Sequence, residues 1–473
     1  MTKRKRVFLF FIFFFAFLLI TPGIILYSIG YRFDFDNQKI TQTGAFYFKV
    51  FPKRAQIIIN PLYKKEKKVV KTTDFFFGTA YIDDFLPKKY EIEIQKNGYY
   101  PWKKTLEVKE KQVTDAKNIV LFPKNTPLSL NQKEVSEFFI SPDKTKMVLR
   151  QDHKNYWELK LFDLERKIKS HLLTSKDFSS EGAELLAIDF SPGNKTLLLK
   201  TKIQGGEIKY HLIDLESNPP ELNSLDFLGK GIKEIIFNPR KKDKLFFLKK
   251  GEVFEATLTT KEISEPLLKN IFFLSVLGDN LYYLQNQKEG SFFLFKDDFS
   301  FLKKEKINKN PLTLSLAKEQ SPAIYSFGEA LFLQDNENLY WFNQKNKNFE
   351  IFFSADKKPK LSPDAKKLLY FSGHEIWVYY LDNEFSQPQR KKGEKVFIAR
   401  FSKKIQDAFW ITSHYIIFNS GDKIKIAEID DRDGLNIIDF IEGKNGKIFW
   451  QNSLKELYIL ENNLLYTANI PLP

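Results

Sequence analysis

The chain has 473 residues, of which 43% are hydrophobic, and its 74 basic and 59 acidic residues give a formal net charge of +15. This length allows two or three domains, each with its own core. The chain has no cysteine, which excludes disulfides, iron–sulfur clusters, thiolate zinc sites and cysteine nucleophiles. The positive charge favours contact with polyanions, but the lysines are scattered in short runs, as on a lysine-rich solvated surface.

A short basic tail and a long apolar run open the chain. Residues 1–6 contain four basic residues, and residues 7–29 contain no charged one. As a helix, residues 7–29 would span about 34 Å, enough for a bilayer core of about 30 Å. The basic tail predicts that residues 1–6 stay in the cytoplasm and that the rest crosses outward, as in a single-pass protein of the bacterial cytoplasmic membrane. The alternative is a cleaved signal peptide ending near Ser28-Ile29-Gly30, although its apolar region would usually be only about 7–15 residues long.

Residues 31–43 are polar and mixed, which suggests a short connector, and residues 44–122 have a β pattern. Residues 90–95 alternate strictly between apolar and polar side chains, as in a half-buried strand. Asn97-Gly98 is a strong turn signal. We therefore expect a small antiparallel β-sandwich over residues 44–122.

This segment resembles the PEGA domain family. The resemblance is carried by Pro52-Lys53-Arg54-Ala55, by residues 86–94, and above all by the corner Lys96-Asn97-Gly98-Tyr99-Tyr100-Pro101-Trp102. The chain departs from the family in the Glu-Gly centre of the name motif and in the turn glycine, which Lys88 replaces. The resemblance implies a β-sandwich outside the cytoplasmic membrane, loosely tied to surface-layer or polysaccharide contact, without catalytic residues. Tyr99, Tyr100 and Trp102 are the candidate binding patch, although the pattern favours a purely structural corner.

We interpret residues 123–134, with three loop-forming residues in Pro123, Asn125 and Pro127, as a linker to a set of repeats. A sequence motif then recurs, in which an apolar strand end, a Ser-Pro-Asp-type turn and lysines precede another apolar strand. Its clearest copies contain Ser141-Pro142-Asp143, Ser191-Pro192-Gly193, Asn238-Pro239 and Ser362-Pro363-Asp364. A period of about 50 residues containing several short strands indicates a β-propeller. We expect seven or eight blades over residues 135–473, with candidates at 135–173, 183–217, 231–268, 270–303, 322–348, 357–384, 405–431 and 446–470.

These repeats resemble the PD40 or TolB-like (WD40-like) propeller family, whose blade motif is an aromatic residue, Ser-Pro-Asp-Gly, basic residues and a strand. Ser141-Pro142-Asp143 and Ser362-Pro363-Asp364 match this motif, but neither has the glycine in fourth place. The resemblance implies the fold and no particular function, because propellers host many functions. The fold class predicted for the whole chain is therefore all-β, with an N-terminal transmembrane helix, a small PEGA-like sandwich and a propeller.

No pattern in the sequence indicates catalysis, a cofactor or a metal site. There is no Gly-x-Ser-x-Gly elbow, phosphate loop or dinucleotide fingerprint. The histidines show no metal-ligand spacing and no nearby carboxylate at such spacing; they are His153, His171, His211, His374 and His414. A channel site assembled from several blades stays open. The aspartates at strand ends are expected to serve turns by accepting backbone N–H groups; they are Asp143, Asp163, Asp214, Asp364 and Asp382. The strand tryptophans are expected to pack in cores; they are Trp157, Trp341, Trp377, Trp410 and Trp450.

Two functions fit these patterns. The first is a membrane-anchored extracytoplasmic binding or scaffold protein of the cell envelope, which contacts a protein or glycan through the propeller and the PEGA-like domain and catalyses nothing. The second is an enzyme acting on envelope polysaccharide or peptide, with acids or histidines from several blades meeting in the propeller channel. Nucleic-acid binding is not expected, because no interleaved aromatic and basic face is evident.

Overall fold

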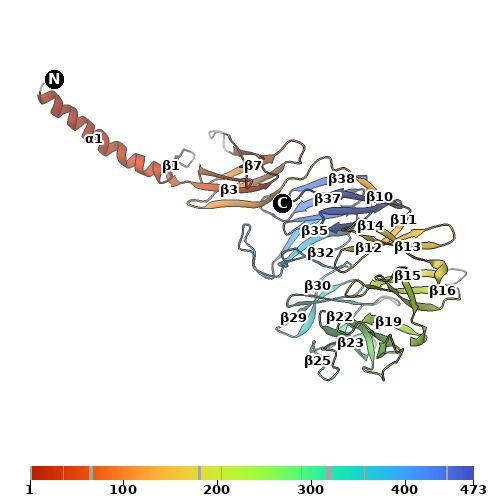
Figure 1. The fold of residues 1–473 in the computed structure, drawn as a ribbon. Coiled ribbons are helices and arrows are strands. Elements are labelled where there is room, and N and C mark those ends of the chain that lie inside the picture. Colours follow the sequence, from red (N-terminus) through yellow and green to blue (C-terminus); the bar gives the residue numbers. More distant parts are fainter. Residues whose placement is uncertain are drawn as a thin grey trace.

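The computed structural model describes residues 3–35, 37–62, 68–178, 183–203, 205–288, 290–315, 321–355, 357–443 and 446–473. A long helix leads to a small β-sandwich, which lies against a larger body of strands (Figure 1). The fold is all-β apart from this helix and two short 3-10 helices in the described residues, which are η1 (Ser175–Asp177) and η2 (Asp226–Leu228).

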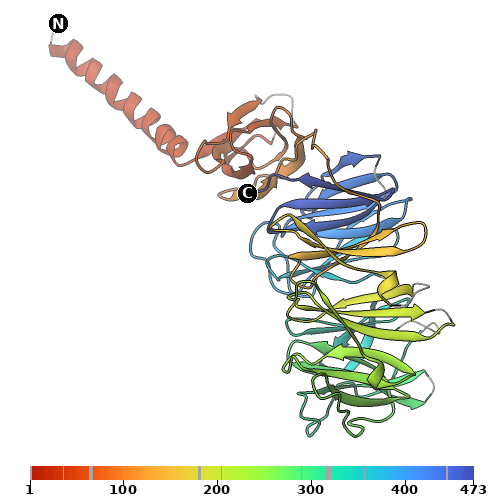
Figure 2. The same cartoon turned by 45° about the vertical axis from the view of Figure 1, so that its right-hand side comes forward.

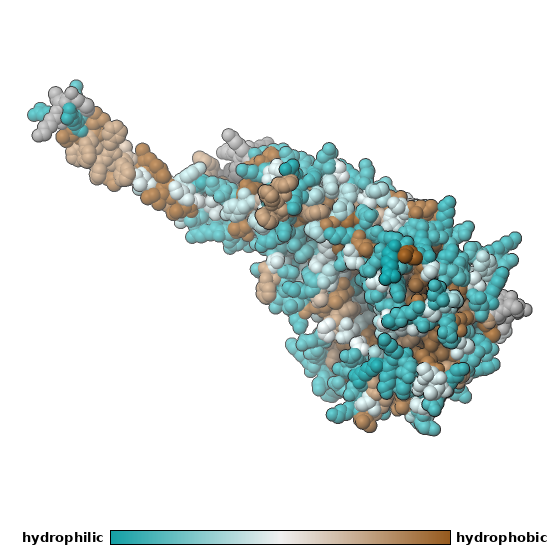
Figure 3. Space-filling model, in the orientation of Figure 1, coloured by the Kyte–Doolittle hydropathy of each residue, from teal (hydrophilic) through white to brown (hydrophobic). Residues whose placement is uncertain are grey.

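Helix α1 (Lys3–Ser28) stands away from the β domains. None of its apolar stretch, Arg4–Ser28, is buried inside the protein. Figure 3 shows this apolar helix beside a body that is mostly hydrophilic on the same face. Among the described residues it is the one helix long and apolar enough to cross a membrane, a property that a signal sequence would share.

A two-stranded hairpin follows the helix directly: β1 (Tyr31–Asp34) pairs with β2 (Lys39–Gln42). Residues 31–43 are thus more than the simple connector that we expected. The hairpin is tied to the sandwich by an ion pair between Asp34 and Lys88, with 2.9 Å between Oδ1 and Nζ and both side chains buried. Polar cross-links of this kind cannot be read from local alternation, because Asp34 and its partner lie in different segments of the chain.

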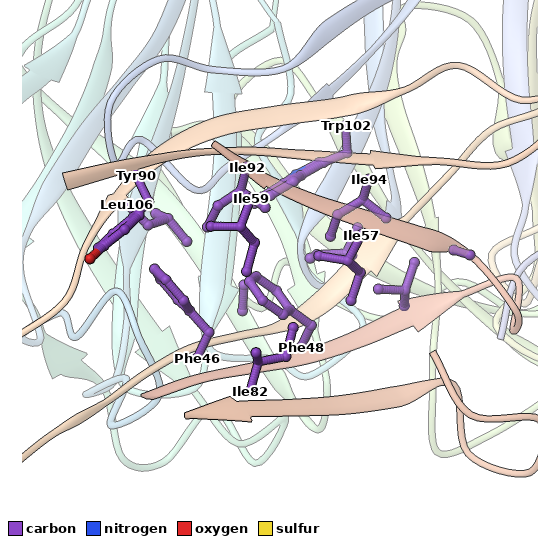
Figure 4. Packing of buried hydrophobic residues seen from close by; sticks show 14 of the residues in the cluster. Phe46, Phe48, Ile57, Ile59, Ile82, Tyr90, Ile92, Ile94, Trp102 and Leu106 are labelled. Carbon is purple, nitrogen blue, oxygen red and sulfur yellow. The ribbon is translucent and has the colours of Figure 1, made fainter. Parts of the chain in front are cut away.

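The sandwich contains one sheet of order β6-β3-β9 and one of order β5-β4-β7-β8. The strands are β3 (Gly44–Phe51), β4 (Gln56–Pro61), β5 (Val69–Thr72), β6 (Thr79–Phe85), β7 (Lys89–Gln95), β8 (Trp102–Glu107) and β9 (Val113–Val120). Alternating residues of both sheets fill the space between them, including Phe46, Ile57 and Ile92 (Figure 4). The unit is not wholly antiparallel as predicted, because β9 returns beside β3 in parallel.

From residue 129 onward the described chain forms eight sheets, one in each segment that the repeats marked as a candidate blade. Their strands are β10 (Ser129–Lys133), β11 (Val135–Ile140), β12 (Lys146–Asp152), β13 (Trp157–Asp163), β14 (Ile168–Thr174), β15 (Ala183–Phe190), β16 (Thr196–Ile203), β17 (Ile208–Asp214), β18 (Glu221–Ser224), β19 (Ile232–Phe237), β20 (Lys244–Lys249), β21 (Glu252–Thr257), β22 (Ile271–Leu277), β23 (Asn280–Lys288), β24 (Ser291–Asp297), β25 (Glu305–Lys306), β26 (Leu312–Thr313), β27 (Ala323–Phe327), β28 (Ala330–Gln334), β29 (Leu339–Asn343), β30 (Asn348–Phe353), β31 (Lys360–Leu361), β32 (Lys367–Phe371), β33 (Glu375–Tyr380), β34 (Lys395–Arg400), β35 (Ile405–Thr412), β36 (Tyr415–Ser420), β37 (Lys423–Glu428), β38 (Ile437–Glu442), β39 (Lys447–Gln451), β40 (Glu456–Glu461) and β41 (Leu464–Asn469).

The sheets close into a ring, which is the architecture of a β-propeller. Each sheet shares a hydrophobic cluster with the next, and the last shares one with the first through Phe138 and Phe449. The first strands of neighbouring sheets touch, as β19 touches β22 and β31 touches β35, so the first strands surround the central channel. Figure 2 shows the first and last sheets side by side, in orange and blue.

One strand from the start of the β region completes the last sheet. Strand β10 pairs with β41, and the sheet runs β10-β41-β40-β39. The segment 123–134, interpreted as a linker, therefore supplies a structural strand. The sequence of β10, Ser-Leu-Asn-Gln-Lys, has one apolar residue and no Pro or Gly punctuation, so only its pairing with a strand more than 300 residues away reveals it.

A buried polar network joins the sandwich to the propeller. Lys104 on β8 contacts Glu428 on β37 with 2.5 Å between Nζ and Oε1, and both side chains are buried. The indole of Trp102 donates to the second carboxylate oxygen of Glu428 at 2.7 Å. The hydroxyl of Tyr415 accepts the backbone N–H of Val120 at 3.1 Å. Because these groups are satisfied only when the two domains are together, the joint is specific.

Candidate functional site

A pocket of ligand size lies where three propeller sheets meet at the channel. It is a cavity of about 420 Å³ lined by the first strands β15, β19 and β22 and by parts of β16 and β17. This volume is within the range of small-molecule sites, about 300–1,000 Å³. Its polar lining includes Asp189, Lys200, Lys233, Glu234 and Ser275.

A β-bulge directs Glu234 toward this pocket. The register of β19 shifts between Ile232 and Glu234, and such a bulge re-aims the side chain that follows it. The same shift occurs at the start of β11, before Glu137, and of β35, before Asp407. Three acids thus occupy one structural position in three different sheets.

These three acids differ in their partners. Glu137 pairs with Lys447, with 3.4 Å between carboxylate and ammonium, and Asp407 pairs with Lys360. Glu234 receives a hydrogen bond from the backbone N–H of Leu274, but its buried Oε2 atom has no hydrogen-bond partner in the described residues. An unsatisfied buried carboxylate oxygen costs about 1–3 kcal/mol or more, so a group that donates to it would be bound favourably.

Burial in the pocket favours a protonated Glu234, and the Lys233 and Lys200 ammoniums oppose this effect. Burial raises the pKa of Glu234 from its ordinary value of 4.5 to about 7, and the charge of Asp189 adds to this rise. Burial also raises the pKa of Asp189, against the opposing effect of the Lys200 ammonium. The carboxyl group of Glu234 is therefore easier to protonate than an ordinary glutamate; its protonated form donates a hydrogen bond and its ionised form accepts one. Two carboxyl groups with raised pKa in one cavity are the kind of arrangement found at functional sites.

The sequence analysis identified neither Asp189 nor Glu234, although the sequence contains a signal for Glu234. Glu234 follows the phrase Ile232-Lys233, Glu137 follows Val135-Ser136, and Asp407 follows Ile405-Gln406. An apolar residue, any residue and then an acid thus opens three of the first strands. A comparison of the repeats at the start of each first strand, rather than at the Ser-Pro turn, would have identified these three acids. It would not have shown that Glu137 and Asp407 pair with lysines while Glu234 does not.

The predicted aromatic patch is part of the joint. Trp102 is only 3% exposed and donates to Glu428. The hydroxyl of Tyr100 donates to the backbone oxygen of Asp439 at 2.8 Å, and Tyr99 packs half-buried on the sandwich core. Trp102 thus faces a second domain that local patterns cannot reveal, as a structural corner would. A binding role for Tyr99 and Tyr100 stays a prediction.

The histidines do not form a metal site in the described part of the chain, where no three His, Cys, Asp or Glu side chains could hold one ion. Two of them nevertheless share a carboxylate, contrary to expectation. His171 Nδ1 lies 2.8 Å from Glu158 Oε1, and His153 Nε2 lies 3.5 Å from Glu158 Oε2. Pairing of β13 with β14 brings His171 beside Glu158, which sequence spacing does not show.

The aspartates at strand ends serve turns, as predicted. Asp143 accepts the backbone N–H of Thr145 at 3.0 Å, and Asp364 accepts that of Lys366 at 3.1 Å. The others do the same for the residues that follow them; they are Asp163, Asp214 and Asp382. Trp157, Trp410 and Trp450 are buried, as expected of core residues, whereas Trp341 and Trp377 are only half-buried.

A second cavity lies in the joint between the domains, lined by residues such as Lys367, His414 and Glu428. Its volume is only about 40 Å³. A water needs about 10–15 Å³ on this measure, so the joint cavity has room for a few waters and not for an organic ligand. Burial lowers the pKa of His414 to about 4, helped by the Lys367 ammonium. The joint is therefore a structural contact rather than a ligand site.

No known family model matches the chain, and no curated protein does. The two family resemblances noted above therefore stay predictions. Solved structures similar to this chain include the Dos1 propeller, at 13% identity and a TM-score of 0.45, covering 73% of this chain and 94% of that chain. A eukaryotic initiation factor is 12% identical at a TM-score of 0.46, covering 74% and 90%. A prolyl endopeptidase is 11% identical at 0.41, covering 71% and 54%. At these scores the likeness carries no argument about function, and the propeller assignment rests on the ring of sheets in the chain itself.

Proposed function

We propose that this chain is a membrane-anchored binding protein of the bacterial cell envelope. Helix α1 stays in the membrane, the sandwich and an eight-bladed propeller lie outside the cytoplasm, and the propeller binds a protein or glycan partner. A polar group of that partner, an amine or a hydroxyl, enters the channel pocket and donates to Glu234. The observation that carries the proposal is the buried Oε2 atom of Glu234, which lies in a pocket of ligand size and has no hydrogen-bond partner among the residues that the structure describes.

The anchor is supported by the exposure of α1. Phe10, Phe13 and Leu19 are 63%, 67% and 79% exposed. Leaving so many apolar side chains in water would cost roughly 25 cal/mol for each Å², which a bilayer removes. The basic residues before the helix support an outward-facing propeller.

Protease treatment of intact cells tests the topology. The propeller should be degraded from outside while the short tail before α1 is protected. Degradation only after cell lysis would contradict an extracytoplasmic propeller.

Ligand capture tests the pocket. Full-length protein in detergent, immobilised on beads, should retain its partner from an envelope extract, and Glu234→Gln should reduce retention at high salt, where nonspecific attraction is screened. Glu137→Gln is the matched control, because Glu137 occupies the same bulge position and already has a lysine partner. Equal retention by both variants and the wild type would contradict a role for the pocket.

An enzyme is the second candidate, favoured by the raised pKa of both Asp189 and Glu234 in one cavity. Such a Glu234 is suited to act as a general acid, for instance on a glycosidic bond. Release of reducing ends from envelope polysaccharide by the wild type, lost in both Asp189→Asn and Glu234→Gln, would support it. Release that survives both substitutions would exclude these residues as the catalytic pair.

A further inference from the structure

The hairpin β1–β2 has its polar side chains inward and its apolar side chains outward. Phe33 and Ile40 are cross-strand partners, and they are 47% and 63% exposed. Phe35, just beyond β1, is 72% exposed and meets the Phe33 ring edge-on at 5.0 Å. On the opposite face, Asp34 and Thr41 are buried. A hairpin on the surface of a water-soluble domain shows the reverse arrangement.

Specific contacts hold the hairpin in this orientation. Asp34 is paired with Lys88 on the sandwich, and Thr41 donates to Glu110. The guanidinium of Arg32 bridges to Asp84 at 2.8 Å. With these three polar pairs formed, rotation of the hairpin to hide Phe33 would leave the buried charges of Asp34 and Lys88 unpaired, which is costly.

A second set of contacts joins the hairpin to the end of α1. The Arg32 guanidinium lies over the Tyr27 ring, 3.5 Å from its centroid, and donates to the Tyr27 backbone oxygen at 2.6 Å. The backbone N–H of Thr43 donates to the oxygen of Gly30 at 2.9 Å. The helix and the hairpin are thus joined without a flexible spacer.

This joint determines where the hairpin lies relative to lipid. A bilayer core of about 30 Å takes up about 20 helical residues. Counted from the basic tail, the core ends near Leu26, so Tyr31 lies within about 10 Å of the hydrocarbon boundary. The headgroup layer is about 5–8 Å thick on each side, and aromatic side chains are favoured there.

We infer that the outer face of the hairpin, formed by Phe33, Phe35 and Ile40, lies in the outer headgroup layer of the membrane. This inference rests on the proposed membrane anchorage of α1. The lipid interface covers the apolar side chains that the fold leaves exposed, and the polar inner face transmits this contact to the sandwich. The membrane therefore holds the β domains at one orientation, instead of letting them swing from the helix.

The absence of cysteine makes a site-specific test direct. Full-length Phe35→Cys and Ile40→Cys are each labelled with the environment-sensitive dye NBD and reconstituted into phosphatidylcholine–phosphatidylglycerol vesicles, with or without a lipid that carries a spin-label quencher on its headgroup. The matched control is Leu302→Cys, an apolar position that is 87% exposed beside β25, at the end of the propeller away from the helix (Figure 1). Flotation of the vesicles is measured first, for all three proteins.

The inference predicts blue-shifted emission at positions 35 and 40, with several-fold stronger quenching by the spin-labelled lipid than at position 302. Proteins that float, but whose labels at 35 and 40 behave like the label at 302, would overturn the inference and leave the anchor intact. Blue-shifted emission without quenching would also overturn it, because a protein surface would then cover the hairpin. Failure to float would remove the membrane anchor and, with it, the inference.

Discussion

Two glutamates, one buried in the joint and one half-buried in the channel, show how differently this chain treats the same group. Glu428 in the joint accepts from Lys104 at 2.5 Å and from the indole of Trp102 at 2.7 Å. Glu234 in the channel has a buried oxygen to which no group in the described part of the chain donates. Burial raises the pKa of both carboxyl groups, so burial alone does not separate them.

The two carboxylates differ in how far their hydrogen-bonding capacity is satisfied. A carboxylate whose partners come from another domain of the same chain is complete, and it stabilises the contact that completes it. A carboxylate that is buried beside an open cavity still has bonding capacity to offer to a ligand. The unsatisfied group is therefore the better guide to function.

The largest expected effect is the loss of the cation at the joint. Lys104→Met leaves Glu428 buried without its partner, and removing one member of a buried ion pair costs about 3–5 kcal/mol. Urea unfolding of the full-length protein in detergent should show this loss. Lys103→Met is the control, because Lys103 is exposed and its pair with Glu93 is worth only about 0–1 kcal/mol. Equal effects of the two substitutions would show that the joint is not held by this pair.

The next effect is the pH dependence of the free energy of unfolding that Glu234 causes in the channel. The folded-state pKa of Glu234, about 7, lies above its ordinary value of 4.5, so the folded protein binds the proton more tightly than the unfolded one. Stability from this group is complete below pH about 4.5 and is lost as the pH rises to about 7, by up to about 3 kcal/mol. Glu234→Gln should remove this fall in the free energy of unfolding.

At the joint, His414 should make the free energy of unfolding change with pH in the opposite direction. The pKa of His414 is lowered from 6.5 to about 4, so its contribution is complete above pH 6.5 and is lost as the pH falls to about 4, by up to about 3 kcal/mol. The same urea series with His414→Asn should show less loss of stability in acid. The two variants control for each other, since their slopes have opposite signs. Parallel slopes would refute the distinction between the regions.

The smallest effect concerns the rim of the joint. Tyr100→Phe deletes the hydrogen bond to the Asp439 backbone oxygen and should cost about 1 kcal/mol. Tyr81→Phe, at a side chain that is 60% exposed, should stay within about 0.5 kcal/mol. A Tyr100→Phe protein as stable as Tyr81→Phe, but with weaker partner capture, would move Tyr100 from the joint to a binding surface.

Much of the architecture could be predicted from local patterns. The alternation in residues 90–95, the Ser-Pro turns at Pro142 and Pro363, and the charge-free run 7–29 each reflect a physical requirement of one short segment. The candidate site could not be predicted in this way. Glu137, Glu234 and Asp407 open their strands alike, and whether a lysine reaches each of them depends on strands elsewhere in the ring.

The sequence by itself determined that this chain is all-β behind one apolar helix, because periodicity and hydropathy act over a few neighbouring residues. Only the tertiary structure decided that β10 closes the ring, that Trp102 is buried against a domain that begins far along the chain, and that the hairpin turns Phe33 and Phe35 outward. Each of these depends on pairing between groups that the fold brings together, such as Trp102 and Glu428, which are 326 residues apart. Local sequence preferences do not depend on such distant partners and so cannot predict them.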